Sequence, residues 1–120
     1  MIIQERIFGQ PPSKPNCYKV GIIAGHGTLV KQSALSKYEQ DFFVQCRNRD
    51  LMLTQFFIIN IDVYFRTMAS DLDNSFKIIL DCLQKCRVIK NDNKCMKIIA
   101  QKHVDKENPR VELTLETIDL

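Results

Sequence analysis

Residues 51–65 read LMLTQFFIINIDVYF and predict one long strand. Side chains alternate between the two faces of an extended chain. One face of this strand is wholly apolar: Phe57, Ile59, Ile61 and Val63. The other face mixes apolar with polar residues: Phe56, Ile58, Asn60, Asp62 and Tyr64. We therefore expect both faces of the strand to be partly covered by the rest of the fold.

Two helices are expected, one before this strand and one after it. Ser33 is expected to cap the first helix, and its apolar residues recur at helical spacing: Leu35, Tyr38, Phe42 and Cys46. The second helix begins near Asp73 and ends near Arg87. Its apolar residues form one stripe: Phe76, Ile79, Leu80, Leu83 and Cys86.

Shorter strands are expected near the N-terminus. Ile2 to Phe8 and Cys17 to Ala24 are strand-like. Gly25-His26-Gly27 is expected to turn the chain, because glycine tolerates positive φ, so that Thr28 to Lys31 return as a partner strand.

The last part of the chain predicts a hairpin. Residues 94–104 and 110–117 read as two antiparallel strands, and residues 105–109 hold the turn residues that join them. The order of elements is therefore strands, helix, strand, helix and hairpin. This order predicts one α+β domain over residues 1–120, with a mixed β-sheet and two main helices.

The composition narrows the class of protein. The 120 residues are 45% hydrophobic and 26% charged, which allows one modest core and leaves pairing with a second copy open. Five cysteines form no CxxC pair, and Gln4, Glu5 and Arg6 interrupt the N-terminal apolar run of a signal peptide. No stretch approaches the length of a membrane span. We expect a reduced, cytoplasmic protein with free thiols.

The net charge of +3 is too small to indicate nucleic-acid binding by itself, but the charge is unevenly distributed. From Gln84 to Lys106 there are seven cations and only two anions. The cations are Lys85, Arg87, Lys90, Lys94, Lys97, Lys102 and Lys106. Such a stretch suits a phosphate backbone, although an ordinary solvated face is the alternative.

The residues best suited to chemistry lie in the stretch from Ser70 to Lys77, which reads SDLDNSFK. If Asp71 is extended, residues 71 and 73 lie on one side of the chain, about 6.6 Å apart along it, and can hold one divalent cation. Asp73, Lys77 and Asp81 then follow one edge of the helix. Aspartates suit Mg²⁺, which can activate water against a phosphodiester, and a lysine can offset charge on the phosphorus oxygens.

Asp92 is a third acidic candidate and lies beyond the second helix. A helix from Asp73 to Arg87 is about 22 Å long. Either the connector runs back along this helix, or a second subunit contributes, before Asp92 can join the other two acids. The sequence leaves both arrangements open.

Structural explanations compete with these roles. Asp71 and Asp73 could simply cap a helix, Asp73 and Lys77 could be an ordinary surface pair, and His26 suits a turn better than catalysis. A zinc site could combine four residues, although their spacing does not match the usual motifs: Cys82, Cys86, Cys95 and His103.

The acidic motif resembles that of the RusA-type Holliday junction resolvases, or crossover junction endodeoxyribonucleases. These small proteins have an Asp-Leu-Asp-Asn motif that opens a helix, then a lysine, and a further aspartate after that helix. This chain has the same features in the same order: Asp71-Leu72-Asp73-Asn74, Lys77, Asp81, Leu83 and Asn91-Asp92. Pro11-Pro12-Ser13 resembles an N-terminal motif of the family, and Arg110 to Leu115 its last strand. The resemblance covers nearly the whole chain.

This resemblance implies a RusA-like homodimer that binds four-way or other branched DNA and makes paired cuts in recombination and repair. Asp71, Asp73 and Asp92 would be the catalytic metal ligands for Mg²⁺, with Mn²⁺ as a substitute, and Lys77 would be the basic residue beside them. The phosphates would contact five cations of the basic stretch and one cation before the motif: Lys85, Arg87, Lys90, Lys94, Lys97 and Arg66.

The chain departs from the family pattern at two places. Family members often carry several arginines before the aspartate motif, whereas this chain has only Arg66, with Ser70 directly before Asp71. Arg87 stands where the family usually has glycine. An altered DNA preference or a weakened activity would follow, so the alternative function is a branched-DNA-binding protein that no longer cleaves. A third hypothesis is an interaction protein whose acids merely cap a helix.

Overall fold

The computed structural model describes residues 1–119, with Ile23 described by its backbone alone. Its main sheet has four strands in the order β1-β6-β4-β5: β1 (Ile2–Phe8), β6 (Arg110–Ile118), β4 (Phe56–Phe65) and β5 (Cys95–Val104). β6 pairs antiparallel with both β1 and β4, while β4 pairs parallel with β5. The predicted α+β class with a mixed sheet is therefore confirmed.

The sequence of β4 explains its central position in the sheet. Its inner face is buried throughout: Phe57, Ile59, Ile61, Val63 and Phe65. Of the outer-face residues only Asn60 is exposed, and the others are half-buried. The strand is shorter than the predicted 51–65, because Asp50 and Met52 have φ angles of 66° and 49°. This left-handed backbone is incompatible with an extended strand before Phe56.

The predicted C-terminal hairpin is wrong. β5 and β6 run in opposite directions but do not pair, because β4 lies between them. Residues 105–109 cross the end of β4, where the Asp105 N–H donates to the Phe65 carbonyl at 2.9 Å. A strand that is apolar on one face and half-buried on the other buries more surface at the centre of a sheet than at its edge. β5, whose residues are mostly exposed, takes the edge instead.

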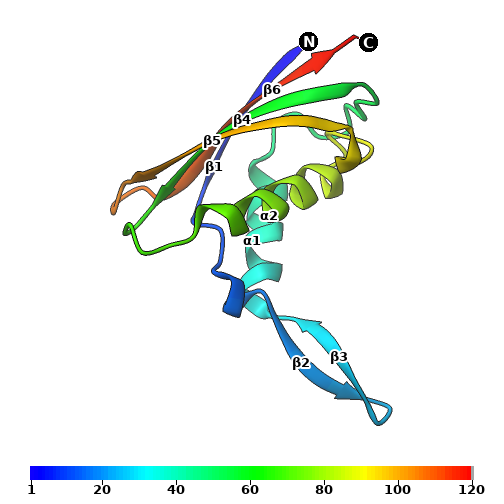
Figure 1. Ribbon diagram of the computed structural model, residues 1–120, viewed down its shortest axis with the longest axis vertical. Helices are drawn as coiled ribbons and strands as arrows, with labels where there is room; N and C mark the ends of the chain where they lie inside the picture. The colour runs from blue at the N-terminus through cyan, green and yellow to red at the C-terminus, as the bar shows by residue number, and fades with distance from the viewer. Residues whose placement is uncertain (120) are drawn as a thin grey trace.

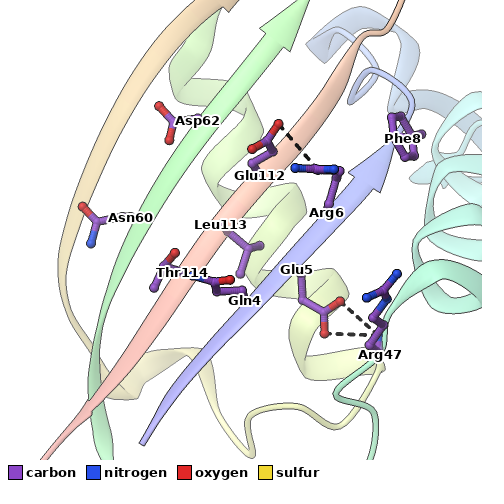
Figure 2. A pocket seen from close by; sticks show the side chains of 10 residues that line it. All are labelled: Gln4, Glu5, Arg6, Phe8, Arg47, Asn60, Asp62, Glu112, Leu113 and Thr114. Carbon is purple, nitrogen blue, oxygen red and sulfur yellow. Dashed lines mark hydrogen bonds and ion pairs between the residues drawn. The ribbon is translucent and has the colours of Figure 1, made fainter.

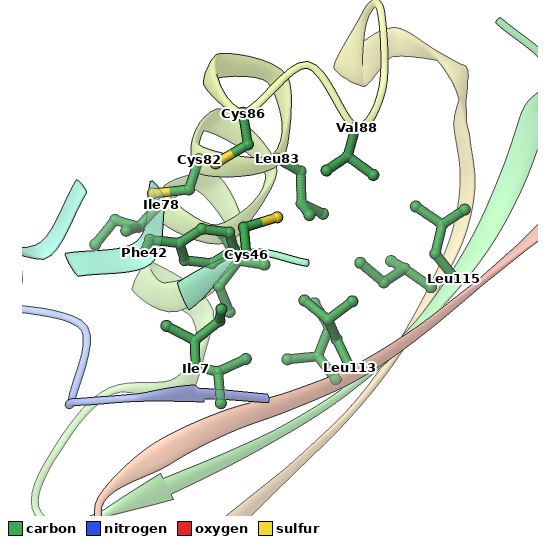
Figure 3. Packing of buried hydrophobic residues seen from close by; sticks show 14 of the residues in the cluster. Ile7, Phe42, Cys46, Ile78, Cys82, Leu83, Cys86, Val88, Leu113 and Leu115 are labelled. Atoms are coloured by element: carbon green, nitrogen blue, oxygen red, sulfur yellow. The ribbon is translucent and has the colours of Figure 1, made fainter. Parts of the chain in front are cut away.

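Helices α1 (Ser33–Gln45) and α2 (Leu72–Lys85) lie on one side of the sheet, and the other side carries no helix (Figure 1). The core lies between the helices and the sheet. Figure 3 shows Phe42 of α1 among Ile78, Cys82 and Leu83 of α2, with Ile7, Leu113 and Leu115 supplied by the sheet. The N-terminus and the C-terminal strand of the chain lie side by side in the sheet, where the Thr117 N–H donates to the Met1 carbonyl at 3.0 Å.

Both helices differ in detail from the predictions. Ser33 is the first residue of α1 and not its cap; Gln32 is the N-cap residue, and no side chain caps this helix. On α2 the predicted residues Phe76 and Leu80 are half-buried, whereas Ser75, Ile78 and Cys82 are buried. The apolar stripe of α2 is therefore turned slightly toward α1.

The remaining elements are a two-stranded ribbon and two short 3₁₀ turns: β2 (Tyr18–Ile23), β3 (His26–Lys31), η1 (Lys14–Asn16) and η2 (Asp92–Lys94). Ala24 and Gly25 form the turn of the ribbon, with φ angles of 53° and 82°. His26 pairs with Ile23 in the ladder, so it is a strand residue and not the turn residue that was predicted. Within the described part of the chain, no helix has the length and apolar character needed to cross a membrane.

Candidate active site

Asp71 and Asp73 lie at the start of α2, as the sequence predicted. Asp71 is the N-cap residue with φ −86° and ψ 123°, an extended conformation, and Asp73 lies in the first helical turn. The Asp71 carboxylate accepts no capping hydrogen bond, and Asp73 Oδ1 accepts only from the adjacent Asn74 N–H at 2.9 Å. Both residues are exposed. Helix capping therefore does not account for this pair of acids.

The loop before the acids is fixed by the N-terminal segment. The Gln10 side chain accepts from the Arg66 N–H at 2.9 Å and donates to Ser70 Oγ at 3.4 Å. The Asn74 amide donates to the Pro12 carbonyl at 3.0 Å. These contacts join the Pro-Pro-Ser motif to the acidic motif. The sequence did not predict these contacts of Gln10 and Asn74, and the only signal for them was the presence of both motifs in one chain.

Lys77 lies one turn after Asp73 on the same side of α2. Its side chain is 81% exposed, and Nζ lies 3.6 Å from Asp81 Oδ2. Asn74, Lys77 and Asp81 line a cavity of about 180 Å³ that Lys14 of η1 also lines. Lys14 is thus a second cation beside the acidic motif, and its position directly after Pro11-Pro12-Ser13 was the only sequence signal for it.

Asp92 lies at the opposite end of α2. It begins η2, and its N–H donates to the side chain of Gln84 at 3.0 Å. Gln84 lies about 16 Å along the helix from Asp73, at 1.5 Å of rise per residue. The connector does not run back, so Asp71 and Asp73 are brought together in one chain and Asp92 is not. Among residues 1–119, no group of three or more His, Cys, Asp or Glu side chains could hold a metal ion.

The comparison with known protein families identifies the fold and the activity class. Residues 10–116 match the family described as endodeoxyribonuclease RusA. The chain belongs to the RusA family. No curated protein matches it. RusA membership makes the chain a nuclease of the endodeoxyribonuclease class and implies that it acts on Holliday junctions.

Asp71 and Asp73, the two acids at the start of α2, suit a magnesium ion. Mg²⁺ prefers hard oxygen ligands, and one or two carboxylates with several waters are its usual protein shell. Within residues 1–119, neither Asp71 nor Asp73 forms an ion pair with lysine or arginine, so their oxygens are free to bind a cation. The residues considered for zinc are dispersed, since Cys82 and Cys86 lie in the core and His103 binds Asp62 at 2.7 Å.

The six candidate DNA-binding cations divide between the two ends of the RusA domain. Arg66 follows β4, at the end of the sheet that leads to Asp71. The other five lie toward the opposite end, with Asp92, because the start of β5 pairs with the start of β4: Lys85, Arg87, Lys90, Lys94 and Lys97. In one chain these five cations therefore accompany Asp92 and not the acidic motif.

Not all of these cations are equally available to phosphates. Lys85 pairs with Glu39, which also binds Lys31 at 2.7 Å. Burial alone would raise the pKa of Glu39, but the two lysines outweigh burial and lower it, so the carboxylate stays charged. Arg87 lies 3.5 Å from Asp50, and Lys94 packs over the Phe56 ring at 4.5 Å. Three others are exposed and have no carboxylate partner among the described residues: Arg66, Lys90 and Lys97.

The two departures from the RusA pattern have visible consequences. Arg87 has a φ of 59°, the left-handed conformation that glycine adopts most easily. Its N–H donates to Gln84 O and the Val88 N–H donates to Leu83 O, both at 3.0 Å, which is the hydrogen-bond pattern of a Schellman motif. Ser70 binds Gln10, so it supports the loop.

A second hollow lies over the face of the sheet that the helices leave open (Figure 2). Its volume is about 480 Å³, and polar residues such as Gln4, Asn60 and Asp62 line it. The nearby Glu5 carboxylate is buried and accepts from the backbone N–H groups of Arg47 and Asn48 at 2.9 and 2.8 Å. This hollow contains none of the predicted site residues.

Proposed function

We propose that this RusA-family chain is a Mg²⁺-dependent endonuclease that resolves Holliday junctions in DNA recombination and repair. It would act in the cytoplasm as a homodimer. One observation carries the proposal: Asp71 and Asp73 are exposed and have no cationic partner in the described part of the chain, at the start of a helix whose N-terminus attracts anions. Two carboxylates at a positive helix end can bind a cation and still leave room for a phosphate.

Asp71 and Asp73 would hold the magnesium ion, or Mn²⁺ in its place. When bound, the ion would lower the pKa of a coordinated water and stabilise the leaving oxygen of the phosphodiester. Lys77, one turn along the same helix side, would place a positive charge near the phosphorus oxygens as their negative charge increases. Lys14 would contact a neighbouring phosphate through the same cavity.

Asp92 would complete the site from a second copy of the chain. In one chain it lies at the far end of a rigid helix, beyond the reach of an aspartate side chain. In a twofold dimer with antiparallel α2 helices, the start of one α2 would meet the end of the other, and two identical sites would form. The same arrangement would bring Lys90, Lys94 and Lys97 to the phosphates around each site. Two equivalent sites also suit paired cuts in a four-way junction.

The test is cleavage of a synthetic four-way junction in Mg²⁺, with binding measured separately in the absence of metal. We expect Asp71→Asn and Asp73→Asn to reduce cutting by about a thousandfold while junction affinity is retained. Glu116→Gln is the matched control, because Glu116 is an exposed carboxylate on β6 with no ion-pair partner among the described residues. Cutting by Asp71→Asn at the parental rate would refute the assignment. Binding without any cutting by the parent protein, in Mg²⁺ and in Mn²⁺, would favour the alternative of a binding protein that has lost catalysis.

A further inference from the structure

The β2–β3 ribbon projects from the rest of the molecule (Figure 1). One of its faces is apolar, because Val20 pairs with Leu29 across the strands and Ile22 lies two residues further along the same face. Val20 is 74% exposed, Leu29 71% and Ile22 80%. They are the three most exposed large hydrophobic side chains of the described residues.

Such a ribbon is unusual for a protein in water. An isolated pair of strands is marginally stable at best, and it normally packs its apolar face against a third element. Here the face that could provide that packing points into solvent. A contiguous exposed apolar patch of this kind marks a binding surface.

The charge near the ribbon identifies the class of partner. From Ile7 to Tyr38 the chain has no aspartate or glutamate and four lysines: Lys14, Lys19, Lys31 and Lys37. Lys31 is paired with Glu39, but Lys14 and Lys19 are exposed. A second copy would bring like charges face to face, whereas a polyanion with apolar surfaces would satisfy both features. DNA at a branch point is such a partner, since base stacking is interrupted there.

The base of the ribbon is tied to the candidate active site. The Gln32 N–H donates to the Cys17 carbonyl at 2.9 Å and closes the ribbon, and the Gln32 amide donates to Pro15 O at 2.7 Å. A few residues earlier, the Pro12 carbonyl accepts from the Asn74 amide beside Asp73. The ribbon therefore has a defined position relative to the acids.

We propose that the β2–β3 ribbon is a wedge that inserts Val20, Ile22 and Leu29 against unstacked bases at the branch point of the DNA. This inference rests on the proposed function and deepens it, because it names the element that distinguishes a junction from a duplex. Apolar side chains that enter DNA must unstack bases. The free-energy cost is least where bases are already unpaired or unstacked, so the wedge favours branched over linear DNA.

The experiment uses the full chain, without metal, and a four-way junction with 2-aminopurine at the branch point, whose fluorescence rises when the base unstacks. The parent protein raises the fluorescence. The triple variant Val20→Ser/Ile22→Ser/Leu29→Ser does not, and its preference for the junction over a linear duplex falls about tenfold, the typical size of one lost stacking contact. Val44→Ser is the matched control, because Val44 is 68% exposed on α1.

Three results would overturn the wedge. The triple variant could raise the fluorescence as the parent does, or lose affinity for duplex and junction by the same factor, or change from dimer to monomer in sedimentation. The last result would make the ribbon a contact between copies. A junction with mismatched bases at the branch point should restore the preference of the variant. These measurements need no cleavage, so a protein that opens the junction but does not cut it when Mg²⁺ or Mn²⁺ is added would refute the proposal of a Mg²⁺-dependent nuclease and leave the wedge intact.

Discussion

The two ends of α2 differ in the charged residues that they carry. At the start of the helix, Asp71 and Asp73 have no ion-pair partner among the described residues, and the nearby cations are Lys77, Lys14 and Arg66. At the other end, a single acid, Asp92, is accompanied by most of the basic residues. The first end suits metal binding and the second suits phosphate binding. In the proposed nuclease, neither end would have what the chemistry needs without the other.

This difference explains why a chain of 120 residues with one small core would work as a pair. A rigid helix keeps the two ends about 21 Å apart at 1.5 Å per residue. In the proposed function, this separation would make a second copy of the chain necessary for a complete site. It would also prevent a single chain from cutting DNA before the second copy is in place.

The largest effect is expected from removing the lone acid at the second end. Asp92→Asn should reduce cutting of a four-way junction about a thousandfold, as much as Asp73→Asn, since the loss of a metal ligand removes several kcal/mol of transition-state stabilisation. Single-turnover cleavage at saturating enzyme measures this. If Asp92→Asn cut normally, the second end would have no part in catalysis.

A smaller loss is expected when the cation of the first end is removed. Lys77→Met should lower the cleavage rate about a hundredfold with little change in junction affinity, because its charge matters mainly as negative charge develops on the phosphate. Lys77→Arg should recover part of the rate. Lys14→Met should change affinity and not the rate, which distinguishes the two lysines. Equal rates for Lys77→Met and the parent would exclude Lys77 from the site.

The basic residues of the second end should affect binding alone. Lys90→Ala and Lys97→Ala should each weaken junction binding and reduce the slope of log affinity against log salt by about 1, as expected for one lost phosphate contact. Lys85→Ala should have a smaller effect, because Glu39 already neutralises Lys85. Binding titrations at several salt concentrations test whether Lys90→Ala and Lys97→Ala lose more affinity than Lys85→Ala. An unchanged salt slope in Lys90→Ala/Lys97→Ala would place the DNA elsewhere.

The smallest effect is expected on the stability of the fold, from relieving the left-handed backbone of Arg87 at the second end of α2. Arg87→Gly should stabilise the fold by about 0.5–1 kcal/mol, because the left-handed conformation has a higher free energy for a residue with a Cβ than for glycine. The midpoint of thermal unfolding should therefore rise by a few degrees. Arg66→Gly serves as the control, since Arg66 has no positive φ, and it should destabilise slightly. A lower midpoint for Arg87→Gly would show that the Arg87–Asp50 contact outweighs the strain.

Local features were predictable from the sequence because they depend on neighbouring residues. The approximate bounds of α2 and the buried face of β4 follow from spacing and periodicity, whereas the extended conformation of Asp71 was only a condition of the predicted metal site. The length of α2 showed that Asp92 needs either a connector that runs back or a second subunit to reach Asp73, but it did not distinguish the two. The left-handed Arg87 was signalled only by a departure from a family glycine.

Features that depend on distant pairing were not predictable. The order β1-β6-β4-β5 inserts β4 between two strands that are adjacent in sequence, and no local turn signal encodes that insertion. The contacts of Gln10 and Asn74 join residues about sixty positions apart. The basic stretch was visible as a run of charge, but its location beside Asp92 came only with the fold.

The most direct test of the two-ended site is to mix inactive variants. Asp71→Asn and Asp92→Asn dimers, each inactive alone, are unfolded together and refolded to exchange subunits. If the acids of one site come from two copies, each mixed dimer has one intact site, and nicking of one strand of the junction returns. The double variant Asp71→Asn/Asp92→Asn refolded with parent protein gives mixed dimers with no intact site. A mixture of the two single variants as inactive as its components would contradict the account.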